Sequence, residues 1–200
     1  MQRDLAGTLC GIAGPTAFVG AWVAGGLVTD GYDPLQDAIS RLAAEGAPTR
    51  PLMTAGLVAF GVLVPVWARV LGERLDSAPL RRVVTVAGLA TLAVAALPLT
   101  REGGTTQDAL HAVAAGTGYL AMAATPLVAA PLLRRRGRTR AAAASVAVGV
   151  LSAACLVGTL VVGEDGALGS GGLQRLGLTV VDAWHVVAAV AVLRGGLRRR

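Results

Sequence analysis

The sequence predicts an all-α, polytopic membrane protein, a bundle of six transmembrane helices in which residues 1–200 form a single integral membrane domain. The first observation is composition, because 54% of the residues are hydrophobic and only 15% are charged, whereas a soluble domain is about 25% charged. The second observation is the mean hydropathy of +0.63, which also indicates a membrane protein. The third observation is that apolar runs of about 20 residues, long enough to cross the hydrocarbon of a bilayer, recur along the chain.

The expected spans are residues 5–29, 51–71, 83–99, 109–133, 141–162 and 176–193. None shows the strict alternation of polar and apolar residues that a strand of a membrane barrel requires, so the spans are predicted to be helices. Pro15, Pro65 and Pro126 lie inside three of them. We expect these prolines to kink the helices and not to end them, because neighbouring helices can satisfy the freed carbonyl groups.

The distribution of arginine predicts how the chain crosses the membrane. All 18 basic residues are arginines. If the N-terminus is cytoplasmic, four of them lie outside (Arg41, Arg50, Arg101 and Arg175) and the other fourteen inside, which is the expected positive-inside bias. The prediction is a multi-pass protein of the cell membrane with both termini in the cytoplasm. The basic segment 134–140 then contacts membrane lipids, and no nucleic-acid partner is expected.

The loop between the first two spans is expected to contain a short helix. Asp33 can cap its N-terminus with Pro34 at the first helical position, and Leu35, Ile39 and Leu42 recur on one face. The default interpretation is an amphipathic helix that lies at the membrane interface. The alternative is a lid over the outer mouth of the bundle.

Two spans carry an Asp and a His three residues apart, Asp108 with His111 and Asp182 with His185. Residues at this spacing share a helix face. Ionisable side chains are costly in a bilayer, so both faces should point into the bundle. Together with polar residues of the first outer loop they predict an outward-facing polar cavity. The candidate site residues are Asp37, Ser40, Asp108, His111, Asp182 and His185.

Three functions are compatible with this pattern. The cavity could bind or pass a small or lipid-like ligand, or protons. It could instead hold zinc on His111, His185 and Asp182 with an open position for water, which would make the protein a hydrolase of a lipid-like substrate. The third alternative is a structural membrane subunit in which the Asp and His pairs are packing clamps between helices.

The segment GYDPLQDAISRL, residues 31–42, follows a first span that contains GIAGP and precedes PLMTAGLVAFGV in the second span. With a histidine near the start of the fourth span, this arrangement resembles the domain of unknown function 998 (DUF998) family of six-span bacterial and archaeal membrane proteins. The resemblance implies the six-span fold and no particular reaction. A weaker likeness is to the superfamily of alkaline ceramidases and progestin/adipoQ-type receptors, whose members place a Ser, an Asp and three histidines around zinc; this chain has two histidines.

Overall fold

The computed structural model describes residues 2–161 and 169–196, and in this part of the chain all the regular structure is helical. Six long helices are present, each long and apolar enough to cross a membrane. They are α1 (Gln2–Val28), α2 (Arg50–Leu75), α3 (Ala78–Ala96), α4 (Thr106–Arg135), α5 (Thr139–Val161) and α6 (Gly169–Leu193). The prediction of a six-helix membrane bundle is confirmed, and the prolines expected inside α1, α2 and α4 lie within continuous helices.

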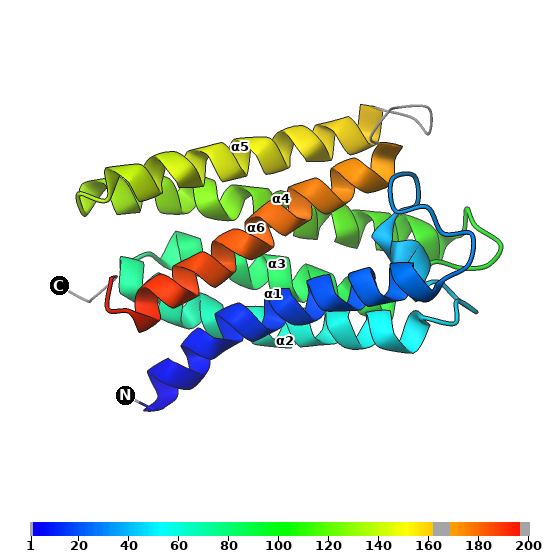
Figure 1. Ribbon diagram of the computed structural model, residues 1–200, viewed down its shortest axis with the longest axis horizontal. Coiled ribbons are helices and arrows are strands. Elements are labelled where there is room, and N and C mark those ends of the chain that lie inside the picture. Colours follow the sequence, from blue (N-terminus) through cyan, green and yellow to red (C-terminus); the bar gives the residue numbers. More distant parts are fainter. Residues whose placement is uncertain (1, 162–168, 197–200) are drawn as a thin grey trace.

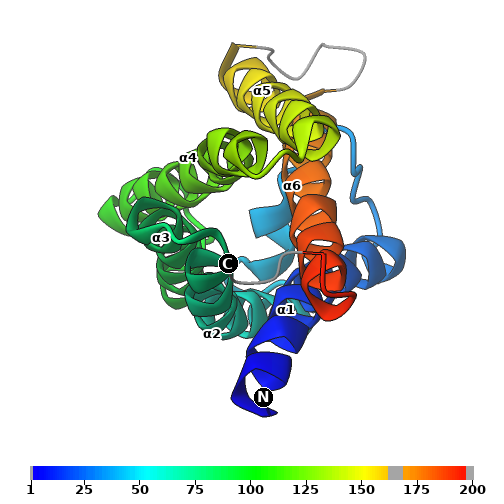
Figure 2. The same ribbon diagram turned by 90° about the vertical axis from the view of Figure 1, so that its left-hand side faces the viewer.

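The helices form a ring in chain order (Figures 1 and 2). Each packs against the next, and α6 returns to pack against α1 and close the ring. The start of α1 and the end of α6 lie at one end of the ring (Figure 1), which we call the terminal end. The opposite end, where α1 ends and α2 begins, we call the η1 end after the short helix described next.

The loop between α1 and α2 contains a single 3-10 helix, η1 (Ile39–Ala43), which differs from the longer amphipathic helix that the sequence suggested. Leu35, expected on its apolar face, is 45% exposed, whereas Ile39 and Leu42 are 4% and 1% exposed. The helix packs against α1, α2 and α6. It therefore covers the end of the ring, and a position at the membrane interface is not confirmed.

Hydrogen bonding explains why an α-helix does not form over residues 33–42. Asp33 uses its carboxylate within a turn, accepting from the Leu35 N–H at 2.8 Å. The carbonyl groups of Pro34, Leu35, Gln36 and Asp37 all accept hydrogen bonds from α6. Carbonyl groups that accept from another helix are drawn away from the i to i+4 bonds of a local α-helix.

α6 begins seven residues before the predicted span, at Gly169 and not at residue 176. Arg175 was predicted to lie in the outer loop, because the sixth apolar run begins after it, at residue 176. In the structure Arg175 lies six residues after Gly169, the first residue of α6, and is only 7% exposed. The residues that make this burial possible belong to the loop before α2, which is far away in sequence.

Candidate functional site

A cavity of about 80 Å³ lies inside the ring near the η1 end. Residues of α1, α2, α3, α4, α6 and η1 line it, so every described helix except α5 contributes. Most of the wall is apolar, formed by residues such as Phe18, Leu57 and Phe60. The polar lining residues are Ser40, Thr91, His111, Tyr119 and Gln174.

His111 is held in one orientation by the end of α3. Its Nδ1 lies 2.6 Å from the carbonyl oxygen of Leu97. A carbonyl oxygen only accepts, so Nδ1 carries the hydrogen and donates it. In the neutral ring Nε2 is then left with a lone pair. His111 is 4% exposed and lines the cavity, so it offers a hydrogen-bond acceptor to a molecule bound there.

Gln174 of α6 and Ser40 of η1 also line the cavity. The side-chain carbonyl oxygen of Gln174 accepts from the backbone N–H of Ile39 at 2.9 Å, which joins α6 to η1. This bond leaves the amide N–H groups of Gln174 as donors. Ser40 lines the same cavity, so Gln174 and Ser40 add hydrogen-bond donors to a wall that also holds the acceptor of His111.

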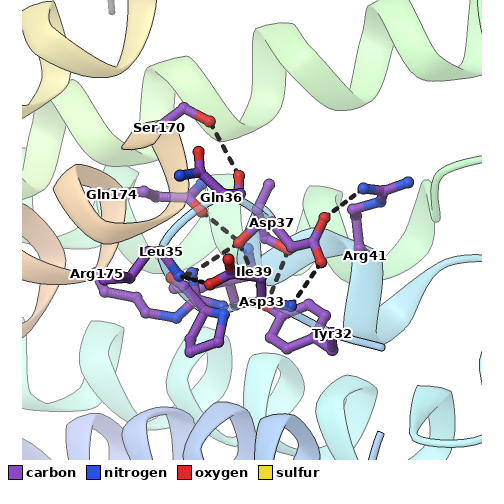
Figure 3. Close-up of polar contacts among 12 residues, drawn as sticks. Tyr32, Asp33, Leu35, Gln36, Asp37, Ile39, Arg41, Ser170, Gln174 and Arg175 are labelled. Atoms are coloured by element: carbon purple, nitrogen blue, oxygen red, sulfur yellow. Dashed lines mark hydrogen bonds and ion pairs between the residues drawn. The ribbon is translucent and has the colours of Figure 1, made fainter. Parts of the chain in front are cut away.

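Arg175 fastens the loop to α6 (Figure 3). Its guanidinium donates to the carbonyl oxygens of Pro34 and Asp37, each at 2.7 Å, and to the hydroxyl of Tyr32. It also lies over the rings of Trp22 and Tyr32, 5.4 and 5.3 Å from their centroids. The charge is thus stabilised by carbonyl dipoles and aromatic faces, and burial of Tyr32 raises the pKa of its phenol.

Asp37, a predicted site residue, acts in the loop and not in the cavity. Its carboxylate accepts from the backbone N–H of Asp33 at 2.9 Å and pairs with Arg41 (Figure 3). Only its backbone carbonyl is used by Arg175. The side chain therefore shapes the turn that precedes η1.

Glycines at the start of α6 let the loop approach closely. A Cβ atom at Gly171 would lie 2.4 Å from the carbonyl oxygen of Asp37, and one at Gly169 would lie 2.3 Å from that of Leu35. Gly172 donates its N–H to Leu35 at 2.8 Å, and the hydroxyl of Ser170 donates to Gln36 at 3.2 Å (Figure 3). The glycine-rich start of α6 is thus a docking surface for the loop.

Asp108 caps a helix. Its carboxylate accepts from the N–H and the hydroxyl of Thr100 at 2.8 and 2.7 Å and from the N–H of Thr105 at 2.9 Å. Thr105 in turn accepts from the Asp108 N–H, which completes a capping box at the start of α4. Asp108 and His111 share a helix face, but they bond to different partners and not to each other.

Asp182 and His185 lie deeper in the bundle, 2% and 0% exposed. Trp67 of α2 donates its indole N–H to Nδ1 of His185 at 3.1 Å. Neither carboxylate oxygen of Asp182 has a hydrogen-bond partner among the described residues, and neither has Nε2 of His185. A direct Asp182 to His185 clamp is therefore absent from the described structure.

The six predicted site residues separate into distinct groups. Ser40 and His111 line one cavity, whereas His185 lies about 24 Å along α6 from its η1 end and His111 about 8 Å along α4. Among the described residues no group of three or more His, Cys, Asp or Glu side chains is arranged to hold a metal ion. The roles of Arg175, Gln174 and Trp67 were not predicted, because none of these residues has a spacing signal of its own.

Comparison with known proteins gives one match. No curated protein and no solved structure matches this chain. The model of the family described as "Protein of unknown function (DUF998)" matches residues 12–191, which include all of the cavity lining, the Arg175 clamp and the Trp67 to His185 pair. The protein is a multi-pass membrane protein, and it belongs to the DUF998 family.

Proposed function

We propose that this protein binds a small, neutral, lipid-like molecule in the cavity at the η1 end. The observation that carries the proposal is the composition of the cavity wall, which combines apolar side chains with hydrogen-bonding groups that are still able to accept or donate. Binding sites for small molecules are typically apolar with a few oriented polar groups. The cavity is small, but a single water molecule needs only about 10–15 Å³ by the same measure. The cavity therefore accommodates part of a ligand, such as a headgroup or a short length of chain.

The polar and apolar lining residues are separated along the bundle. Ser40 lies in η1, and His111 and Gln174 lie about 8 Å from the η1 ends of α4 and α6. Phe18 and Phe60 lie about 15 Å from the same ends of α1 and α2. An amphipathic molecule therefore fits with its polar group beneath η1 and its apolar part toward the middle of the membrane.

The ligand is expected to be uncharged because none of the lining residues is charged. The nearest charged groups of the loop are engaged elsewhere, Arg175 with carbonyl oxygens and Asp37 with Arg41. A charged ligand would be buried without a counter-ion, which costs several kcal/mol. A hydroxyl or ester group suits the acceptor on His111 and the donors on Gln174 and Ser40.

We further propose that the η1 end faces outward from the cell membrane. The described residues at the terminal end include a concentrated group of arginines at the ends of α2 to α6: Arg74, Arg81, Arg82, Arg134, Arg135, Arg136, Arg138, Arg140 and Arg194. Cytoplasmic loops carry the excess of arginine in membrane proteins. In this orientation a ligand reaches the cavity from the outer leaflet or from the external medium.

The test uses a fluorescent monoacylglycerol and protein in nanodiscs of phosphatidylcholine. We expect saturable binding that weakens about tenfold in His111→Leu, the loss of one hydrogen bond worth about 1.4 kcal/mol, and that disappears in Leu57→Trp, which fills the cavity. The matched control is Val58→Trp, because Val58 is the next residue of α2, is 42% exposed and does not line the cavity. Oleate and oleylamine, of similar chain length but charged, should bind more weakly.

Two results would contradict the proposal. One is equal binding of the neutral, anionic and cationic amphiphiles in all variants, which would indicate partition into lipid. The other is equal loss of binding in Val58→Trp and Leu57→Trp, which would show that the cavity is not the site.

A further inference from the structure

Asp182 is a buried carboxylate without a hydrogen-bond partner among the described residues. It lies at the fourteenth position of the 25-residue helix α6, near its middle, and is 2% exposed. Neither of its oxygens accepts a hydrogen bond from any described residue. His185, one turn along the same face, is turned toward Trp67 of α2. The cost of burying a carboxylate in this way is not offset by anything within the described chain.

A groove on the side of the bundle includes Asp182 in its lining. It lies between α1 and α6, has a volume of about 380 Å³, and includes Thr16, Gly20, Thr179, Asp182 and Ala183 in its lining. Thr16, Gly20 and Ala183 are exposed, so the groove faces away from the ring, toward the acyl chains of a membrane. It is separate from the cavity at the η1 end, with which it shares no lining residue.

The chemistry of the groove defines what would fit it. Asp182 is the one ionisable residue in its lining, and most of the other lining residues are apolar. A cation that approaches from the lipid must itself be lipid-soluble, because a hydrated inorganic ion is excluded from hydrocarbon. Attraction between opposite charges is strong in such an apolar setting and does not need a direct hydrogen bond.

We propose that the groove between α1 and α6 binds a lipophilic organic cation, an amine or onium ion with apolar substituents, whose charge pairs with Asp182. The apolar substituents lie along Val19 and Val23 of α1 and Val186 of α6. Gly20 provides the room, since a Cβ atom built there meets no other atom within 4 Å. This site is independent of the neutral ligand proposed for the cavity.

The probe for the test is tetraphenylphosphonium, a permanent cation, measured by equilibrium dialysis against protein in phosphatidylcholine nanodiscs. We expect affinity to fall at least tenfold in Asp182→Asn and to be largely retained in Asp182→Glu. Gly20→Trp, which fills the groove, should abolish binding. Gly116→Trp is its matched control, because Gly116 is also an exposed helical glycine with no atom within 4 Å of a built Cβ.

A second ligand tests whether the charge is required for binding, and a second variant tests whether the η1 cavity is involved. Tetraphenylmethane, which has the same shape without the charge, should show no difference between the native protein and Asp182→Asn. Leu57→Trp, which fills the η1 cavity, should leave tetraphenylphosphonium binding unchanged, so failure of this inference and failure of the proposed function are distinguishable. Unchanged affinity for tetraphenylphosphonium in well-folded Asp182→Asn, or equal losses in Gly20→Trp and Gly116→Trp, would overturn the inference.

Discussion

Trp67 donates its indole N–H to Nδ1 of His185 at 3.1 Å, and both side chains are fully buried. The bond joins α2 to α6, two helices that are not neighbours in the ring. Because Nδ1 accepts, a neutral His185 ring carries its hydrogen on Nε2. The ring closure at α1 and α6 is thereby reinforced by a polar contact across the interior of the bundle.

Replacing Trp67 by Phe should destabilise the protein by more than the loss of one hydrogen bond. The variant leaves Nδ1 of His185 buried without a donor, for which we expect a decrease of about 1–3 kcal/mol in the free energy of unfolding, in addition to the change in packing. Unfolding with dodecyl sulfate in mixed micelles measures it. Trp22→Phe is the control, since the Trp22 indole N–H is buried without a hydrogen-bond partner in the described structure.

Both substitutions replace an indole by a phenyl ring, so they remove the same side-chain volume, and Phe at position 22 still presents an aromatic ring to Arg175. Trp22→Phe should therefore lower the free energy of unfolding by less than Trp67→Phe does. The difference between the two decreases measures the contribution of the bond to His185. If the two variants are equally destabilised, the bond contributes nothing beyond packing, and His185 would have to be held by something other than Trp67.

Asp108 should prove to be a structural residue. Asp108→Ala removes the acceptor for Thr100 and Thr105, so the start of α4 frays and the midpoint of thermal unfolding falls by several degrees. Binding of the monoacylglycerol at saturating protein should survive at temperatures where the variant is folded. Asp30→Ala, an exposed carboxylate at the same end of the bundle, should leave the midpoint unchanged; a loss of binding by folded Asp108→Ala would instead assign it to the site.

The six helices could be predicted because each span is a long apolar segment, and their length and composition depend on residues that are adjacent in sequence. The site could be predicted only in part. Ser40 and His111 were candidates and do line one cavity, but the two residues of each Asp and His pair do not bond to each other, and each histidine bonds to a different helix. The spacing of residues on a helix predicts which of them share a face. It does not predict which groups from distant parts of the chain form hydrogen bonds with them.

Arg175 and Asp108 both show this limit of prediction from sequence. Arg175 appeared to be an outer-loop arginine, because its burial depends on carbonyl groups of Pro34 and Asp37 that lie some 140 residues away. Asp108 was predicted to be a cavity residue. In the structure its carboxylate takes part in the capping box with Thr105 and not in the cavity. Backbone acceptors of a loop have no sequence signature, so contacts of this kind emerge only in the folded chain.

The Arg175 clamp should control access to the cavity. Arg175→Lys keeps the charge but loses the planar fork that reaches several carbonyl oxygens at once, and we expect a loss of about 2 kcal/mol or more in stability. With both native cysteines replaced by alanine, a cysteine at Ser40 should react faster with a small maleimide in the Arg175→Lys background. Arg41→Lys, which alters an exposed ion pair, is the control and should cost less than about 1 kcal/mol.

An unchanged rate of labelling at position 40 in folded Arg175→Lys would show that the loop stays closed without the guanidinium. The remaining bonds from Gly172, Ser170 and Gln174 would then suffice to hold it.

The direction of insertion can be tested with single cysteines in a chain whose Cys10 and Cys155 are replaced by alanine. We expect a cysteine at Glu102, in the exposed connection between α3 and α4, to react with a membrane-impermeant maleimide in intact cells. A cysteine at Thr139, exposed at the start of α5 beside the arginines of residues 134–140, should react only after the membrane is permeabilised. The physical reason is that arginine-rich loops are retained on the cytoplasmic side during insertion. The reverse pattern would place the η1 end in the cytoplasm, and the cavity would then take its ligand from the inner leaflet.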